Sequence, residues 1–293
     1  MRKVFKIRKI SVPSAIMCLF LLFYSATLLA LYLWGFSTSL KTVDDFMTNM
    51  VGLPKAWEWN NYVKALDLFA LPIFKNGRLY NIGFEGMLLN SIIYSLMVPL
   101  VTLSTTWLMA YLCYQFPGRM SSFIFRINIV LMMIPIVGSL PSALKVYTSL
   151  NLYDTWGYVF VSSITFVGPN FLIFYAVFQG IDKGLKEAAQ IDGAGNFSIM
   201  LGIIFPLTAV MFGVLFITSF ITNWNTYMPM IIWLPSKPSL AYGMYKFGAS
   251  TVSGSSWPPI QVAGSMIVML PILIIFLIFR NKIIGSVTIG SFK

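Results

Sequence analysis

Six long apolar runs constrain the fold of this chain more than any other feature. A helix needs roughly 20 mostly apolar residues to cross the hydrocarbon core of a membrane. Each run is long enough to do so and is bounded by charge, proline or glycine. We therefore expect an all-α membrane protein, a single transmembrane domain over residues 1–293, with six transmembrane helices at about 12–37, 86–113, 122–143, 157–180, 206–233 and 260–280. Pro99, Pro135 and Pro271 fall inside these runs, where neighbouring helices can satisfy the freed backbone groups.

The composition agrees with a lipid-covered surface. Charged residues make up 10% of the chain and apolar residues 58%, whereas a soluble domain carries about 25% charged residues. The net charge is +11, but the basic residues are scattered at the ends of apolar runs and form no sustained basic face. A nucleic-acid partner is therefore not expected.

Enzymatic and metal-binding functions are disfavoured by the residues that the chain lacks. It has no histidine, and its two cysteines, Cys18 and Cys113, lie inside apolar runs without a CxxC pair. The commonest general base and metal ligand is therefore absent, and we expect no catalytic residues, no metal and no cofactor. The stretch 285–291 resembles a phosphate loop but lacks the required lysine. Energy for any transport must come from another subunit or from a gradient.

The distribution of lysine and arginine predicts the orientation, because cytoplasmic loops are enriched in both. In a six-span layout, the side that carries both termini has twelve basic and three acidic residues, a net charge of +9. The opposite side has eight basic and six acidic residues, a net charge of +2. Both termini are therefore predicted to be cytoplasmic. The first apolar run is longer than the roughly 7–15 residues of a signal-peptide core, so we interpret it as a retained span.

A long outer segment, about residues 38–85, separates the first two predicted spans. It carries apolar and aromatic residues at helical spacings, namely Trp57, Trp59, Tyr62, Leu66 and Phe69. This spacing predicts either a short amphipathic element near the interface or an aromatic belt at the edge of the bilayer.

The loop at 181–205 is a polar interruption between the fourth and fifth predicted spans. Its first part has a helical pattern, Asp192-Gly193 should break that helix because glycine adopts backbone angles that other residues resist, and residues 194–201 could form a second short helix. The loop is rich in alanine and glycine, so a partner backbone could approach it closely, and Glu187 offers one charge to that contact. We expect a cytoplasmic helix-turn-helix; the alternative is a simple connector.

The loop resembles the signature of importer-type ABC transporter permeases. The matching positions are Glu187, Ala188, Ala189, Gly193, Ile203 and Pro206, with Phe205 in place of the usual leucine. The order of the spans, the tail at 284–290 and Asn223-Trp224-Asn225 resemble the carbohydrate-uptake branch, and most of all the second permease subunit of maltose-type systems.

This resemblance implies a multi-pass permease subunit of a bacterial cytoplasmic-membrane ABC importer for a sugar or oligosaccharide. The implied partners are a second permease subunit, a dimer of ATP-binding subunits that binds the ATP, and an extracytoplasmic solute-binding protein. It also implies that the loop docks on the ATPase, and we assign that coupling to Glu187, Ala188, Ala189, Asp192 and Gly193. The alternative function is a gradient-driven carrier or channel that needs no ATPase.

A candidate substrate path lies at the end of the fifth predicted span. Asn223, Trp224, Asn225 and Tyr227 combine amides with aromatic faces, as sugar sites do. The alternative is helix–helix packing with hydrogen bonds between helices. The near absence of charge inside the spans favours an uncharged substrate over a proton-coupled carrier, but the sequence does not identify the sugar.

Overall fold

The chain is mostly helical over the residues that its computed structural model describes, which are 12–75, 77–135, 137–249 and 257–289. The elements, in chain order, are α1 (Val12–Ser39), α2 (Val43–Thr48), α3 (Asn60–Leu68), β1 (Leu71–Lys75), β2 (Arg78–Ile82), α4 (Phe84–Gln115), α5 (Arg119–Met133), α6 (Leu140–Ser149), α7 (Trp156–Ser163), α8 (Pro169–Gln179), α9 (Lys183–Ile191), α10 (Asn196–Ile199), the π-helix η1 (Met200–Ile204), α11 (Phe205–Trp224), α12 (Met228–Ile232), α13 (Leu240–Ala249) and α14 (Pro258–Ile289). The predicted basic N-terminal tail lies outside the described residues, as does the last residue of the predicted tail motif, Gly290.

Four helical stretches of the described chain are long and apolar enough to cross a membrane. They are α1, α4, the continuous run 196–224 and the first part of α14, residues 258–278. They correspond to the first, second, fifth and sixth predicted spans. Pro99 and Pro271 lie inside α4 and α14, as expected. The helix of the fifth predicted span, α11, ends earlier than predicted, at Trp224.

The third predicted span, 122–143, is not one continuous helix. The helix α5 ends at Met133, and α6 begins at Leu140. The residue before a proline is biased toward extended conformations, and Ile134, which precedes Pro135, has ψ 112°. Gly138 then adopts a positive φ of 77°. Pro135 therefore lies in a break between two helices, whereas Pro99 and Pro271 lie inside theirs.

The fourth predicted span, 157–180, is also divided. The helices α7 and α8 are separated by residues 164–168, and Gly168 has a φ of 123°, a region that favours glycine. Pro169 then occupies the first turn of α8, where its missing N–H costs nothing. The glycine–proline pair thus divides the run into two helices. The apolar composition had predicted one continuous helix here, and that prediction was wrong.

The described chain forms two units, each with its own packing. The first unit holds residues up to Phe69 and the segment Phe247–Val268. In it, Lys41 is completely buried and its Nζ donates to the carbonyl oxygens of Asn49 at 2.6 Å and Met50 at 3.2 Å. The Asn61 amide donates to the carbonyl oxygens of Ser39 and Lys41. These bonds order the segment around α2 and α3, where the sequence predicted either an amphipathic element or an aromatic belt.

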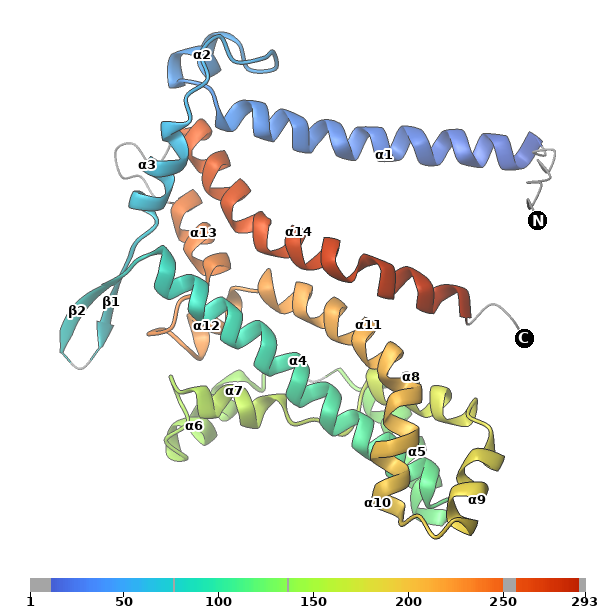
Figure 1. Cartoon of the computed structure of the whole chain (residues 1–293). Helices are drawn as coiled ribbons and strands as arrows, with labels where there is room; N and C mark the ends of the chain where they lie inside the picture. Colours follow the sequence, from blue (N-terminus) through green and yellow to red (C-terminus); the bar gives the residue numbers. More distant parts are fainter. Residues whose placement is uncertain (1–11, 76, 136, 250–256, 290–293) are drawn as a thin grey trace. The chain divides into compact units, whose positions relative to one another are not determined.

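The second unit, which holds Ala70–Lys246 and continues from Met269, is organised around α4. The helices α5, α7, α8 and α11 all pack on α4 (Figure 1). Its main core is aromatic and lies between α4, α8 and the start of α11, with buried Trp107, Tyr111, Phe171, Phe174 and Phe178. Trp107 donates from Nε1 to Thr208 Oγ1 at 3.0 Å, so a hydrogen bond also links α4 to α11.

The unit also contains an antiparallel hairpin that was not predicted from the sequence. Strand β1 pairs with β2 in a register that places Phe74 opposite Leu79. Gly77 supplies the positive φ that the tight turn requires. The hairpin precedes α4, and it shows that the outer segment contains strands as well as short helices.

Candidate functional site

The clearest candidate site is the turn between α9 and α10, because hydrogen bonds close both ends of α9 while several residues of the turn stay exposed. Asp182 begins α9 by accepting a hydrogen bond from the Gly184 N–H at 2.9 Å. At the other end, the Ala194 N–H donates to the Ala189 oxygen at 2.9 Å and the Gly193 N–H to the Gln190 oxygen at 3.1 Å. This pair of bonds is a Schellman motif, which needs a left-handed residue after the helix.

Gly193 provides that residue, with a φ of 82°. A Cβ at this position would meet no atom within 4 Å, so the need for glycine is conformational rather than steric. A side chain in this region costs about 1–2 kcal/mol. The turn at Asp192-Gly193 that the sequence predicted is therefore present in the structure.

The five residues predicted to couple to an ATPase lie together on this turn but differ in exposure. Glu187, Ala188, Asp192 and Gly193 are exposed, whereas Ala189 is half-buried and packs against the core of the unit. Ala189 therefore holds α9 to the body of the protein, and the other four residues remain accessible.

Two apolar residues on the same turn were missed by the sequence reading. Ile191 is 86% exposed and Phe197 is 70% exposed. Ile191 follows Glu187 by four residues, so the two lie on one helical face. The available signal was an isoleucine at helical spacing from a charged residue within an otherwise polar loop.

The turn is attached firmly to the helices behind it. Ala194 and Ile199 pack against the core between α4 and α8, together with Ala189. The Gln115 side chain, at the end of α4, donates from Nε2 to Asn196 Oδ1 at 3.0 Å. A displacement of the turn would therefore be passed directly to α4.

The helix that follows the turn is continuous with a predicted span. The sequence predicted a short helix at 194–201 and a separate span from 206, but α10, η1 and α11 form one run from Asn196 to Trp224. The π-helix lies immediately before Pro206, where the Phe205 N–H bonds to the Met200 oxygen. Proline cannot fit a regular helix interior without losing a hydrogen bond, and a π-bulge accommodates it. The turn thus connects to α11 without a hinge loop.

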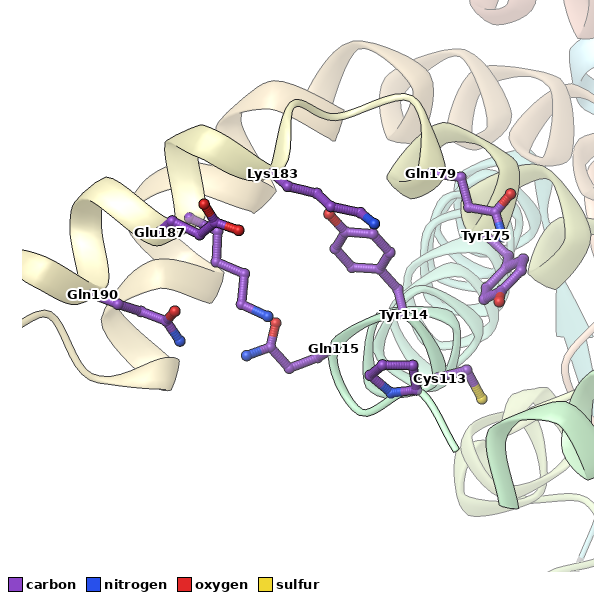
Figure 2. A pocket seen from close by; sticks show the side chains of 10 residues that line it. Cys113, Tyr114, Gln115, Tyr175, Gln179, Lys183, Glu187 and Gln190 are labelled. Carbon is purple, nitrogen blue, oxygen red and sulfur yellow. The ribbon is translucent and has the colours of Figure 1, made fainter. Parts of the chain in front are cut away.

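A polar hollow of about 520 Å³ lies beside α9 (Figure 2). Lys183, Glu187 and Gln190 project into it from α9, and Gln115 and Gln179 face it from the ends of α4 and α8. Its remaining lining residues are Cys113, Tyr114, Pro117, Tyr175 and Lys186. One predicted coupling residue, Glu187, therefore lines a cavity as well as the exposed turn.

The predicted substrate-path residues lie at the end of α11 and in the bend after it. Trp224 is buried, with 1% exposure, and stacks on Phe220 at a centroid distance of 5.8 Å. The amides of Asn223 and Asn225 donate to carbonyl oxygens of their own helix, at Ser219 and Ile221. Tyr227 stacks on Tyr245 at 4.5 Å. The structure thus separates the buried Trp224 from the exposed Asn225.

In the part of the chain that the structure describes, no group of three or more histidine, cysteine, aspartate or glutamate residues lies close enough to hold a metal ion. Cys18 is exposed and Cys113 is buried, and neither forms a disulfide.

Several bacterial transport proteins are similar to this chain over most of its length. The arabinooligosaccharides transport system permease protein AraQ of Bacillus subtilis is 27% identical over 243 residues, which cover 82% of this chain and 80% of the relative. The diacetylchitobiose uptake system permease protein NgcG of Streptomyces coelicolor is 22% identical over 278 residues, covering 93% and 87%. The sn-glycerol-3-phosphate transport system permease protein UgpE of Agrobacterium fabrum is 28% identical over 214 residues, covering 72% and 75%.

The fold is also similar to a solved structure. A chain in the crystal structure of a bacterial ABC transporter involved in the import of the acidic polysaccharide alginate matches with a TM-score of 0.73. The match covers 95% of this chain and 99% of that chain, at 20% sequence identity. It supports the fold.

The model of one protein family matches residues 106–286, which is more than half of the 293 residues. The matched region contains the capped turn, the Asn223–Tyr227 segment and most of the second unit. The family describes a membrane component of a transport system and not an ATP-hydrolysing subunit, so the chain is a multi-pass transport protein without a catalytic role of its own. The chain belongs to the family of binding-protein-dependent transport system inner membrane components.

Proposed function

We propose that this permease subunit imports a sugar or oligosaccharide and that the α9–α10 turn couples it to a separate ATPase. The observation that carries the proposal is the exposed face of Glu187, Ala188 and Ile191 on a helix whose C-terminal end is closed by a Schellman motif. A surface with exposed apolar side chains on a well-ordered turn suits a protein partner.

The attachments of the turn explain how docking would reach the transport helices. The Gln115–Asn196 hydrogen bond leads into α4, and the unbroken run from Asn196 leads into α11. Movement of an ATPase subunit against the turn would therefore displace two candidate spans together. The proposed assembly contains a second permease subunit, two ATP-binding subunits and an extracytoplasmic binding protein, with both termini and the turn in the cytoplasm.

Two observations support a sugar substrate. Relatives that match most of the chain are named for arabinooligosaccharides and diacetylchitobiose. In the candidate path, the exposed Asn225 and the stacked Tyr227 supply an amide and an aromatic face. The buried Trp224 supports this segment from behind and does not contact substrate.

Purification of the tagged chain from its native cells in mild detergent tests the coupling. Mass spectrometry of the co-purifying proteins should identify a second permease subunit and an ATPase. The ATPase should be lost when Glu187 and Gly193 are both replaced, while the second permease remains. A chain that purifies alone would instead favour the gradient-driven carrier or channel.

A further inference from the structure

A second hollow, the α5–α8 groove, adjoins the hollow beside α9 and shares Tyr175 and Gln179 with it, but none of the roles above is assigned to it. It has a volume of about 500 Å³. Each helix contributes four residues at helical spacing, which are Ser122, Phe125, Arg126 and Ile129 from α5, and Leu172, Tyr175, Ala176 and Gln179 from α8. The rings of Phe125 and Tyr175 approach to 5.1 Å between centroids and form its floor.

The groove is polar at one end and apolar at the other. Ser122 lies near the start of α5, and Gln179 is the last residue of α8, so both belong to the end nearest the α9 turn. Ile129 and Leu172 lie farther along the two helices and contribute only hydrocarbon. A single molecule that filled the groove would therefore need a polar head and an apolar tail.

Arg126 gives this groove its charge. Within the described chain it has no carboxylate partner, since the ion pair found there joins Lys237 and Asp154. It lies seven residues beyond Arg119, about 10 Å along α5. The helices α5 and α8 both pack on the candidate span α4, so this arginine belongs to a helix that lies against a candidate span.

The opposite side of α5 shows that Arg126 faces outward. Asn128 is completely buried and its Oδ1 accepts a hydrogen bond from the Gly168 N–H at 2.8 Å. Residues two apart in a helix lie about 200° around its axis, so the exposed Arg126 points away from that packed face. A charged side chain inside a membrane is costly unless it is paired. An outward arginine must find its anion outside the chain.

We propose that the α5–α8 groove binds an anionic phospholipid, with its phosphate on Arg126 and part of an acyl chain along Ile129 and Leu172. Arginine recognises phosphate through paired N–H donors, and basic pockets between membrane helices on the cytoplasmic side bind anionic headgroups. A lipid in that leaflet has the same polar-to-apolar direction as the groove. A flat protein surface would require neither this gradient nor a hollow.

The test uses the complex as it co-purifies, reconstituted with phosphatidylcholine and phosphatidylglycerol, and then stripped and weighed by native mass spectrometry. The unmodified complex should retain phosphatidylglycerol in preference to phosphatidylcholine. Arg126→Gln should lower that retention about ten-fold, as expected for a lost hydrogen bond to a charged group. Arg126→Lys should restore part of it.

Two further variants make the result specific. Arg119→Gln, at the exposed start of the same helix and outside the groove, should leave retention unchanged. Ala176→Trp should abolish retention by filling the groove without altering any charge. The proposal would be overturned if Arg126→Gln and Ala176→Trp retained as much phosphatidylglycerol as the unmodified complex. It would also be overturned if Arg119→Gln lost as much as Arg126→Gln.

The remaining outcomes separate other occupants. Soluble glycerol phosphate, added in place of the lipid, should leave no bound mass, because the apolar half of the groove would stay empty; a stable adduct would overturn the lipid assignment. Crosslinking of Arg126→Cys to a second permease subunit would also overturn it, since protein would then cover the groove.

The proposal rests on the proposed orientation for the choice of leaflet. Lipid retention needs no ATPase, so the lipid experiment can still be interpreted if the proposed coupling to an ATPase proves wrong.

Discussion

The sequence predicts functional residues in both the α9–α10 turn and the Asn223–Tyr227 segment. In the structure the two regions differ in how far their side chains are exposed. In the turn, a Schellman motif closes α9 while Ile191 and Glu187 remain exposed. In the segment, the amides bond to their own helix and Trp224 is buried. The turn therefore leaves charged and apolar side chains accessible, whereas most of the segment is occupied in packing and only Asn225 stays exposed.

The largest effect should come from Gly193→Val, which tests whether the shape of the turn matters. A β-branched residue resists a φ of 82°, so the Schellman cap should open at a cost of about 1–2 kcal/mol or more. We expect uptake to be lost while the two permease subunits still co-purify. Gly195→Ala is the matched control, because its φ is −71° and its surroundings are open. Normal uptake by the valine variant would show that the turn does not couple.

Trp224→Ala should mainly lower stability. Removing a buried aromatic side chain from a packed core costs about 3–5 kcal/mol, and this ring is stacked on Phe220. Thermal unfolding of the purified protein in detergent should therefore show a clear drop in midpoint. A variant of unchanged stability that fails to transport would instead place Trp224 on the substrate path.

Ile191→Asp sharpens the assignment of the docking face. Burial of an isoleucine contributes about 1.5–3 kcal/mol, so binding of the ATPase subunit should weaken about ten-fold or more. Titration of the ATPase subunit against the reconstituted permease pair measures this. Leu79→Asp, in the hairpin and 72% exposed, is the control that should bind normally. Equal binding by both variants would exclude Ile191 from the interface.

Asn225→Ala should have the smallest effect of the four. The loss of one hydrogen bond to substrate is worth about 1 kcal/mol, so we expect uptake to fall about five-fold with normal ATPase binding. Asn223→Ala provides the comparison, since its amide is half-buried and bonded to Ser219. If Asn225→Ala transports normally, the whole segment is structural.

Much of the candidate site followed from local sequence. Asp192-Gly193 predicted the break because the need for a positive φ is a property of the residue itself. The exposure of Ile191 and the burial of Ala189 did not follow, because both depend on which side of α9 meets the core. In the same way, Trp224 and Asn225 are neighbours in sequence but differ in burial because the helix turns about 100° per residue.

The sequence by itself determined the membrane class and the positions of the long apolar helices, because the thickness of a bilayer sets the length of apolar run that can cross it. It also carried the loop signature that led to the family. The divisions of the third and fourth runs near Pro135 and Gly168 also have local causes, although the apolar pattern alone did not reveal them. Only the tertiary structure decided that the turn continues into α11 and that Arg126 faces an amphipathic groove. The groove depends on which helices pack together, and contacts between distant residues are not encoded in any local pattern.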